Sequence, residues 1–322
     1  MRHDRRPGRR GGGDGIPRWR AVVFGLAVLL GGGVAAGAAD LSLPAVNLGD
    51  TNFQDGIAFP GWLVQETVSL YRAASFRDAQ GGRRPGSNRV EIASAVTHVA
   101  WMSRAKLLGA WYGMEVLVPF ARVDVHTDFG PRDTDHGLGD VTVCPAFLQW
   151  PEVRLGETSL FQRFNFLVKL PTGDYESRSA VNVGANLVSL NPYYAATWAP
   201  TRRLEASLRL HYLYNLTHRD PFDRLQADRA QPGQAVHANL ALSVEVAEGL
   251  RLGLAGYGLK QVSDDRLDGE ELPHSREQVF GVGPGLKFRT GPWSVYLHCY
   301  REFEAENRPQ GIKGVFRLAR TF

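Results

Sequence analysis

The chain has 322 residues, of which 43% are hydrophobic and 22% charged, with a formal net charge of +4. Residues 1–38 hold seven arginines and no lysine against two acidic residues. Subtracting these from the 37 basic and 33 acidic residues of the whole chain leaves 30 and 31, a net charge of −1. Nucleic-acid binding needs clustered basic charge on the folded domain, so this composition argues against a nucleic-acid partner.

Residues 1–38 have the pattern of a secretory signal peptide. Five arginines open the chain, the apolar run Ala21–Leu30 follows, and the small residues Ala36-Gly37-Ala38-Ala39 form a cleavage pattern. We predict cleavage after Ala38 or Ala39. The alternative, a single membrane anchor, is disfavoured because the apolar run is shorter than the roughly 20 residues that span a bilayer.

Residues 39–61 precede the first strand and are polar, with several Gly and Pro residues. This composition predicts a separate N-terminal segment on the periplasmic side. Its role depends on the strands that follow.

Residues 62–322 contain about twelve stretches of strand length, joined by alternately short and long links. The predicted strands are 62–72, 90–101, 107–124, 140–150, 158–170, 187–199, 204–216, 234–246, 250–262, 276–288, 293–303 and 312–322. Short periplasmic turns and long extracellular loops are typical of outer-membrane β-barrels. The sequence therefore predicts an all-β fold: a single antiparallel transmembrane barrel of about 12 strands. An even strand number places both ends in the periplasm.

Period-2 alternation gives the orientation of three strands. In 204–216, Leu204, Leu208, Leu210 and Tyr212 alternate with polar residues, and segments 158–170 and 234–246 behave alike. A charge on the lipid face at mid-membrane costs roughly 2–4 kcal/mol, so the polar residues must face inward. The predicted lumen-lining residues are Arg163, Lys169, Glu205, Arg209, His211, His237 and Glu245. Segment 250–262 is too apolar and Gly-rich to orient.

Aromatic residues and the C-terminus also fit a barrel. Six tryptophans lie near strand ends, as expected for two girdles at the membrane surfaces: Trp62, Trp101, Trp111, Trp150, Trp198 and Trp293. Alternate apolar residues ending in Phe322 resemble the signal that barrel-assembly machinery reads, although Arg320 departs from it. The predicted partners are this machinery, outer-membrane lipid and lipopolysaccharide, and a small-molecule solute.

Within such a barrel, segment 41–61 suggests a partial plug at the mouth, with a disordered strap as the alternative. Twelve strands lie between packed eight-stranded barrels and open porins of about sixteen strands or more. Cys144 and Cys299 could pair in an oxidising compartment, but two unpaired wall residues are the favoured interpretation.

A series of short blocks runs in order through the mature chain. The blocks are Leu43–Gly56, Pro60-Gly61, Phe76–Gln80, Glu115–Pro119, Gly137–Asp140, Leu170–Asp174, Asn191–Tyr194, Gly233–His237, Ser275–Phe280 and Glu304–Pro309. Together they resemble the meta-pathway phenol-degradation family. The resemblance implies an outer-membrane barrel that takes up aromatic or other hydrophobic compounds, and it supplies no catalytic residues.

Two other classes remain open: an outer-membrane enzyme acting on lipids, and a secreted β-sandwich without a transport role. For an enzyme, His98, His211 and His237 are predicted to face inward, near serines and glutamates in sequence, but triads are recognised only by geometry. The acidic loop 264–271 lacks calcium-loop spacing. We therefore predict a passive diffusion channel with no enzymatic activity, cofactor or metal.

Overall fold

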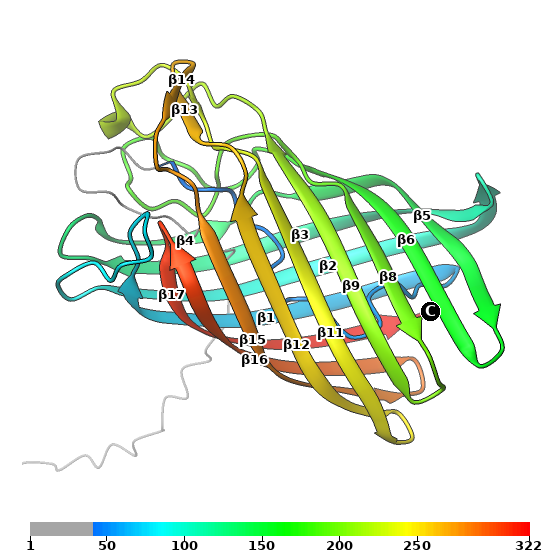
Figure 1. Cartoon of the computed structure of the whole chain (residues 1–322). Coiled ribbons are helices and arrows are strands. Elements are labelled where there is room, and N and C mark those ends of the chain that lie inside the picture. The colour runs from blue at the N-terminus through cyan, green and yellow to red at the C-terminus, as the bar shows by residue number, and fades with distance from the viewer. Residues whose placement is uncertain (1–40) are drawn as a thin grey trace, which may run out of the picture.

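Residues 41–322 are described by the computed structural model, in which twelve antiparallel strands close into a barrel (Figure 1). They are β1 (Gly61–Phe76), β2 (Arg89–Leu107), β3 (Ala110–His126), β5 (Thr142–Leu155), β6 (Thr158–Lys169), the broken strand β7 (Ser189–Leu190) and β8 (Tyr193–Ala199), β9 (Leu204–Asn215), β11 (Ala235–Ala247), β12 (Leu250–Gln261), β15 (Gln278–Thr290), β16 (Trp293–Glu306) and β17 (Pro309–Thr321). The predicted signal peptide, residues 1–38, lies outside the described residues.

Pairing of the first and last strands closes the sheet. β1 pairs with β2 on one side and with β17 on the other, from Leu63 opposite Thr321 to Phe76 opposite Pro309. No strand edge is therefore left open along the wall, which a membrane requires because lipid offers no hydrogen-bond partners. The barrel prediction is confirmed, and closure excludes the β-sandwich alternative.

The two ends of the barrel differ in their connections. Short turns join the strands at one end; Leu108 and Gly109, with φ of 52° and 77°, make the tight turn between β2 and β3. The other end carries the long loops, as expected for the extracellular side. These loops contain β4 (Arg132–Leu138), β10 (Ala230–Gln231), the 3-10 turn η1 (Asp223–Leu225), β13 (Asp265–Leu267) and β14 (Glu270–Leu272). The sequence predicted no strands there.

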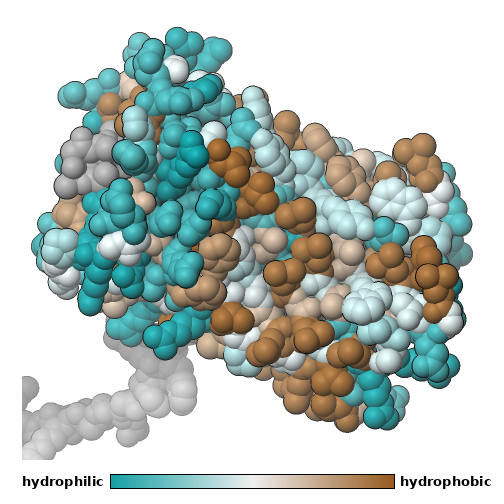
Figure 2. All heavy atoms as spheres, viewed as in Figure 1, coloured by the Kyte–Doolittle hydropathy of each residue, from teal (hydrophilic) through white to brown (hydrophobic). Residues whose placement is uncertain are grey.

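Inward and outward faces alternate as the sequence predicts. Along β9, Leu210 and Tyr212 are exposed while Arg209 and His211 are buried. Figure 2 shows hydrophobic side chains spread over the outside of the barrel strands and hydrophilic ones gathered on the loop end. Among residues 41–322, no helix has the length and apolar character needed to cross a membrane. The apolar exterior of the closed barrel is that of an outer-membrane protein.

Two details differ from the prediction. The expected strand 187–199 is interrupted between β7 and β8 by Asn191-Pro192, because proline has no N–H to donate to the ladder. The six tryptophans near strand ends all lie beside the short turns, at one end of the barrel instead of two, and Trp111 packs against an inner cluster and is not part of a girdle. In line with the favoured interpretation, both cysteines are free; Cys144 is buried and Cys299 is exposed.

One buried carboxyl group holds the extracellular loops together. Asp265 in β13 is 1% exposed and accepts hydrogen bonds from Gly233 N (2.7 Å) and Gln261 Nε2 (2.6 Å), both at Oδ1. Burial raises the pKa of Asp265 to about 7. Its proton is therefore bound more tightly in the folded loops than in an opened loop, where the pKa is near 4.

This shift predicts that the loops lose stability as the pH rises. The contribution of protonated Asp265 is complete below about pH 4 and is lost as the pH passes through about 7. Between pH 5 and 8 the opening free energy should fall by roughly 2–3 kcal/mol. Hydrogen exchange of the amides in 230–234 and 262–268, corrected for intrinsic rates, measures this. Asp265→Asn keeps an oxygen at the same place and should abolish the pH dependence; equal pH dependence in both proteins would contradict it.

Candidate functional site

Residues 41–60, hereafter the luminal segment, run inside the barrel along its length (Figure 1). Leu43 N donates to Glu277 Oε1 (3.1 Å), beside the extracellular start of β15. From there the chain descends through the lumen to Gly61, where β1 begins at the periplasmic rim. The segment therefore starts at the loop end, whereas the sequence led us to expect it on the periplasmic side.

Hydrogen bonds tie the luminal segment to seven barrel strands. Lys313 Nζ donates to Leu48 O (2.7 Å) and forms an ion pair with Asp50 (2.6 Å). The other contacts join Ala45 to Lys169, Asn47 and Gly49 to Asn239, Asn52 to Tyr300, Gln54 to Lys287, Asp55 to Arg209, and Gly56 to Thr197. A polar, turn-rich sequence suits this path because its side chains and backbone meet the polar inner wall.

Two glycines allow the luminal segment to lie close to the wall. Gly49 has φ of +81°, and a Cβ atom there would lie 2.8 Å from ring atoms of both Tyr257 and Tyr300. A Cβ atom on Gly56 would lie 2.4 Å from the backbone nitrogen of Thr197. Larger residues at these positions would push the segment away from β8, β12 and β16.

Alongside the luminal segment, between residues 45–60 and the barrel wall, lies a cavity of about 740 Å³. Its wall includes Gly249, Gly291, Pro292 and Phe322, which belong to the periplasmic turns and rim. The cavity therefore reaches the periplasmic end of the barrel. Five of the predicted lumen-lining residues are in its wall: Arg163, Lys169, Arg209, His211 and Glu245.

The extracellular half of the lumen is packed with apolar side chains. Leu43 and Leu48 of the luminal segment join a buried cluster with Tyr257 and Tyr300. A second cluster brings Val181 and Val183, from the loop between β6 and β7, against inward residues of β1, β2 and β3. The second cluster lies at the extracellular ends of β1, β2 and β3, and none of its residues lines the cavity.

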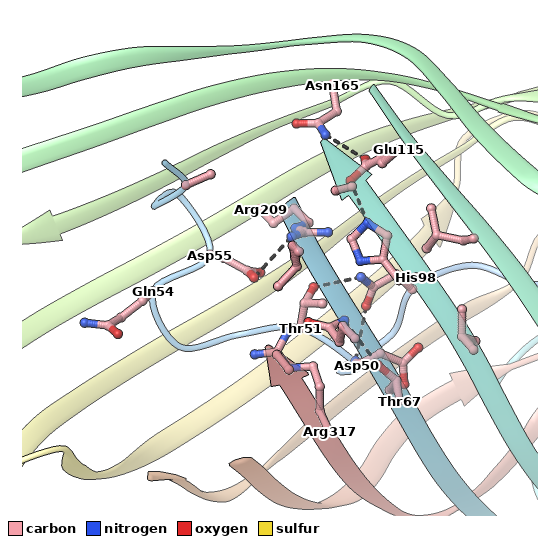
Figure 3. A pocket seen from close by; sticks show the side chains of 18 of the residues that line it. Asp50, Thr51, Gln54, Asp55, Thr67, His98, Glu115, Asn165, Arg209 and Arg317 are labelled. Atoms are coloured by element: carbon pink, nitrogen blue, oxygen red, sulfur yellow. Dashed lines mark hydrogen bonds and ion pairs between the residues drawn. The ribbon is translucent and has the colours of Figure 1, made fainter. Parts of the chain in front are cut away.

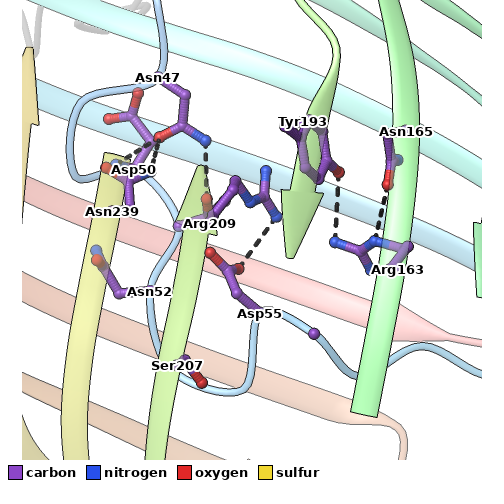
Figure 4. A network of polar contacts seen from close by, with 12 residues as sticks. Asn47, Asp50, Asn52, Asp55, Arg163, Asn165, Tyr193, Ser207, Arg209 and Asn239 are labelled. Carbon is purple, nitrogen blue, oxygen red and sulfur yellow. Dashed lines mark hydrogen bonds and ion pairs between the residues drawn. The ribbon is translucent and has the colours of Figure 1, made fainter. Parts of the chain in front are cut away.

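A polar network centres on Arg209, which projects from β9 toward the luminal segment (Figures 3 and 4). Its Nη2 atom forms an ion pair with Asp55 Oδ1 at 3.1 Å, and its Cζ atom lies 4.4 Å from the centre of the Tyr193 ring. Arg163 donates to Tyr193 OH (3.3 Å) and to Asn165 Oδ1 (3.0 Å). The ion pair thus fixes the middle of the luminal segment to the wall.

On the opposite wall, His98 and Glu115 form a second polar pair (Figure 3). His98 Nε2 lies 2.8 Å from Glu115 Oε2, and Asn165 Nδ2 donates to the other carboxylate oxygen (2.7 Å). The other two histidines predicted to face inward, His211 and His237, stack with ring centres 4.0 Å apart. Both lie within hydrogen-bond distance of Asn191 Oδ1, at 3.1 and 3.2 Å.

The predicted residues Glu205 and His237 are buried in the wall behind the cavity surface. Glu205 accepts a hydrogen bond from Ser243 Oγ (2.7 Å) and lies 3.8 Å from Arg251 Nε. Arg251 also forms an ion pair with Glu245 at 3.0 Å. Lys169, at the top of the cavity, donates to the backbone oxygen of Ala45.

The sequence did not single out a row of charged residues across β12, β15, β16 and β17. Register pairs Arg251 with Lys287, Lys287 with Tyr296, and Tyr296 with Arg317, and all four line the cavity. The alternation of Phe316 and Leu318 on the lipid face was the signal that could have placed Arg317 inside. Over the described range 41–322, no cluster of three metal-ligating side chains is present.

Comparison with known proteins places the chain in a family. A family model described as "Putative MetA-pathway of phenol degradation" matches residues 73–318. The chain belongs to this family. No curated protein matches the sequence significantly.

The chain is similar to several solved structures. An outer membrane channel from Pseudomonas putida F1 is similar, with a TM-score of 0.74, 17% identity, and coverage of 86% of this chain and 100% of that one. The β domain of the Bordetella autotransporter BrkA gives a TM-score of 0.45 at 10% identity, covering 82% and 100%. The Pseudomonas putida toluene transporter TodX gives 0.39 at 8% identity, covering 83% and 91%.

Proposed function

We propose that this protein is an outer-membrane channel through which small aromatic or hydrophobic compounds move down their concentration gradient into the periplasm. The observation that supports it most is the luminal cavity of about 740 Å³, which reaches the periplasmic rim inside a closed barrel. Apolar residues such as Phe53, Leu63 and Phe147 share its wall with charged residues. Such a mixed lining suits compounds with a ring and one polar group. Membership of a phenol-degradation family agrees with this class of solute.

In the same proposal, residues 39–61 act as a plug. The contacts of the luminal segment with seven strands, and its apolar side chains in the extracellular cluster, support this role. Solute from outside reaches the cavity only when part of the segment or the loop holding Val181 and Val183 moves aside. Lumen residues such as Arg163, Arg209 and Glu245 then set the charge preference.

The proposal includes no catalysis. An enzyme of the triad type needs a nucleophile bonded to a histidine. His98 bonds Glu115, and His211 and His237 bond Asn191, whereas Ser207 bonds Thr197 and Ser243 bonds Glu205. These contacts are those expected of polar side chains that line a water-filled barrel interior.

Barrel-assembly machinery and lipopolysaccharide are the proposed partners outside the barrel. Phe322 is 63% exposed, and its backbone exchanges two hydrogen bonds with Trp62 (2.9 and 3.3 Å). Arg320 lies over the rings of Trp293 and Phe322, which accommodates its charge at the membrane surface. This arrangement supports Phe322 as the assembly signal.

Swelling of liposomes that contain the purified protein tests the channel. A dihydroxybenzene should enter faster than into protein-free liposomes of the same lipid, and the protein-dependent rate for arabinose should be smaller. Heat-modifiable migration in detergent gels shows that the inserted protein is folded. Rates indistinguishable from protein-free liposomes for both solutes would contradict the proposal.

A further inference from the structure

The cavity wall has more basic than acidic side chains. Seven Lys or Arg residues line it, namely Arg163, Lys169, Arg209, Arg251, Lys287, Arg289 and Arg317, against five acidic ones, Asp50, Asp55, Glu115, Asp140 and Glu245. Asp55 and Glu245 are engaged by Arg209 and Arg251, and Asp50 by Lys313. Glu115 pairs with His98, and Asp140 accepts backbone hydrogen bonds from Gly173 and Ala185. All five acidic side chains are therefore engaged, and basic side chains remain in excess.

Two of the unmatched cations are buried and adjacent. Lys287 is 7% exposed and Arg317 is 4% exposed, and across residues 41–322 neither has an acidic oxygen within 4.0 Å. Lys287 donates to the neutral side-chain oxygen of Gln54. The Nε atom of Arg317 has no hydrogen-bond partner among the described residues. Burying a cation without an opposite charge is costly, so this pair of cations favours an anion beside them.

Tyr296 lies between these two cations. The Arg317 Cζ atom is 3.6 Å from the centre of the Tyr296 ring, and the Lys287 Nζ atom is 5.0 Å from it. Stacking of this kind holds a guanidinium plane in place while leaving its edge free to donate. Figure 3 shows Arg317 reaching from β17 toward the lumen that the luminal segment crosses. A planar carboxylate is the anion that a guanidinium edge binds best, through two parallel hydrogen bonds.

Apolar groups adjoin the cationic pair. Tyr296 belongs to the same buried cluster as Phe53 and Ala319, and Leu63 packs against that cluster. Phe53, Leu63 and Ala319 also line the cavity. An anion held at Arg317 would thus place any attached ring against apolar side chains, which removes apolar surface from water.

We infer that Lys287, Tyr296 and Arg317 form a binding site for small aromatic carboxylates in the periplasmic half of the lumen. The inference rests on the proposed channel function and narrows its solute class. Arg317 binds the carboxylate by its guanidinium edge, Lys287 adds a second positive charge, and the Phe53 side of the cavity covers the ring. A neutral aromatic hydrocarbon would use only the apolar half of this site.

Equilibrium dialysis of the purified full chain in detergent tests the site, with labelled benzoate, benzyl alcohol and acetate as probes. Benzoate should bind more tightly than benzyl alcohol, which lacks the charge, and than acetate, which lacks the ring. Arg317→Gln and Lys287→Gln should each weaken benzoate binding about tenfold and leave benzyl alcohol unchanged. Arg320→Gln, on the same strand but over Trp293 and Phe322 at the rim, should change neither.

Equal binding of benzoate and benzyl alcohol by the wild-type protein would overturn the inference without any variant. So would full benzoate affinity in folded Arg317→Gln and Lys287→Gln, judged by heat-modifiable migration. If benzoate fails to bind while a dihydroxybenzene still swells liposomes, the site is wrong and the channel stands. If no aromatic solute binds or permeates, the channel proposal fails together with the site.

Discussion

Deleting residues 41–58 should raise the single-channel conductance of the purified protein in planar bilayers severalfold. These residues cross the lumen and place Leu43 and Leu48 in its extracellular half. Removing them leaves a twelve-stranded barrel, a size between packed eight-stranded barrels and the wide porins. Residues 1–40, which include the predicted signal peptide and its cleavage pattern, are kept in this variant so that the predicted export signal is unchanged.

A milder variant separates loss of the plug from damage to the wall. Asp55→Asn removes the charge that pairs with Arg209 at 3.1 Å but keeps the volume of the side chain. Brief openings to the conductance of the deletion variant are expected, because the middle of the luminal segment is then less firmly held. Unchanged conductance in the deletion variant would show that the luminal segment does not limit passage.

Arg251→Met should destabilise the barrel by about 3–5 kcal/mol, because it leaves the buried carboxylate of Glu205 without its cation. Arg251 has a side chain 6% exposed and lies between Glu205, 2% exposed, and Glu245. It also donates to Ser243 Oγ (3.1 Å) and to the backbone oxygen of Arg203 (2.7 Å). Equilibrium unfolding by guanidinium in lipid vesicles measures the change.

Two further variants test whether charge is the cause. Arg289→Met removes an exposed arginine that lines the cavity near the periplasmic turns, and should change the stability by less than about 0.5 kcal/mol. Glu205→Gln combined with Arg251→Met removes the most buried unpaired charge and should recover much of the loss. A midpoint for Arg251→Met equal to that of the wild type would refute the role of this ion-pair cluster.

Strand number and strand orientation could be predicted because a membrane wall imposes a strict rule on each second residue. In β6, β9 and β11 the alternation of apolar and polar side chains is clear, and Arg209 and Asn165 face inward as the pattern indicates. The cost of a charge in lipid leaves no alternative phase for such strands.

The sequence analysis missed the inward-facing Arg251 and Lys287 for a local reason. β12 and β15 are rich in glycine and apolar residues on both faces, so neither Arg251 nor Lys287 has a phase that the sequence reveals. The pairing register shows that both side chains face inward: Glu245 opposes Arg251 across a short turn, and Arg251 opposes Lys287. Pairing between strands is a tertiary property that one strand's pattern does not contain.

The path of the luminal segment could not be read from the sequence either. Its contacts join residues far apart in the chain, such as Leu48 and Lys313, which are 265 positions apart. The segment has no period, because it is neither a strand nor a helix. Only Gly49 and Gly56 hinted at close approach to another part of the chain.

The most direct measurement is the initial uptake rate of a labelled phenolic compound, at low external concentration, by cells lacking the gene and by the same cells complemented with it. Passage through this barrel predicts slower uptake in the deletion strain, recovery with the wild-type gene, and faster uptake with the variant lacking residues 41–58. Identical initial rates in all strains would contradict a channel for such compounds.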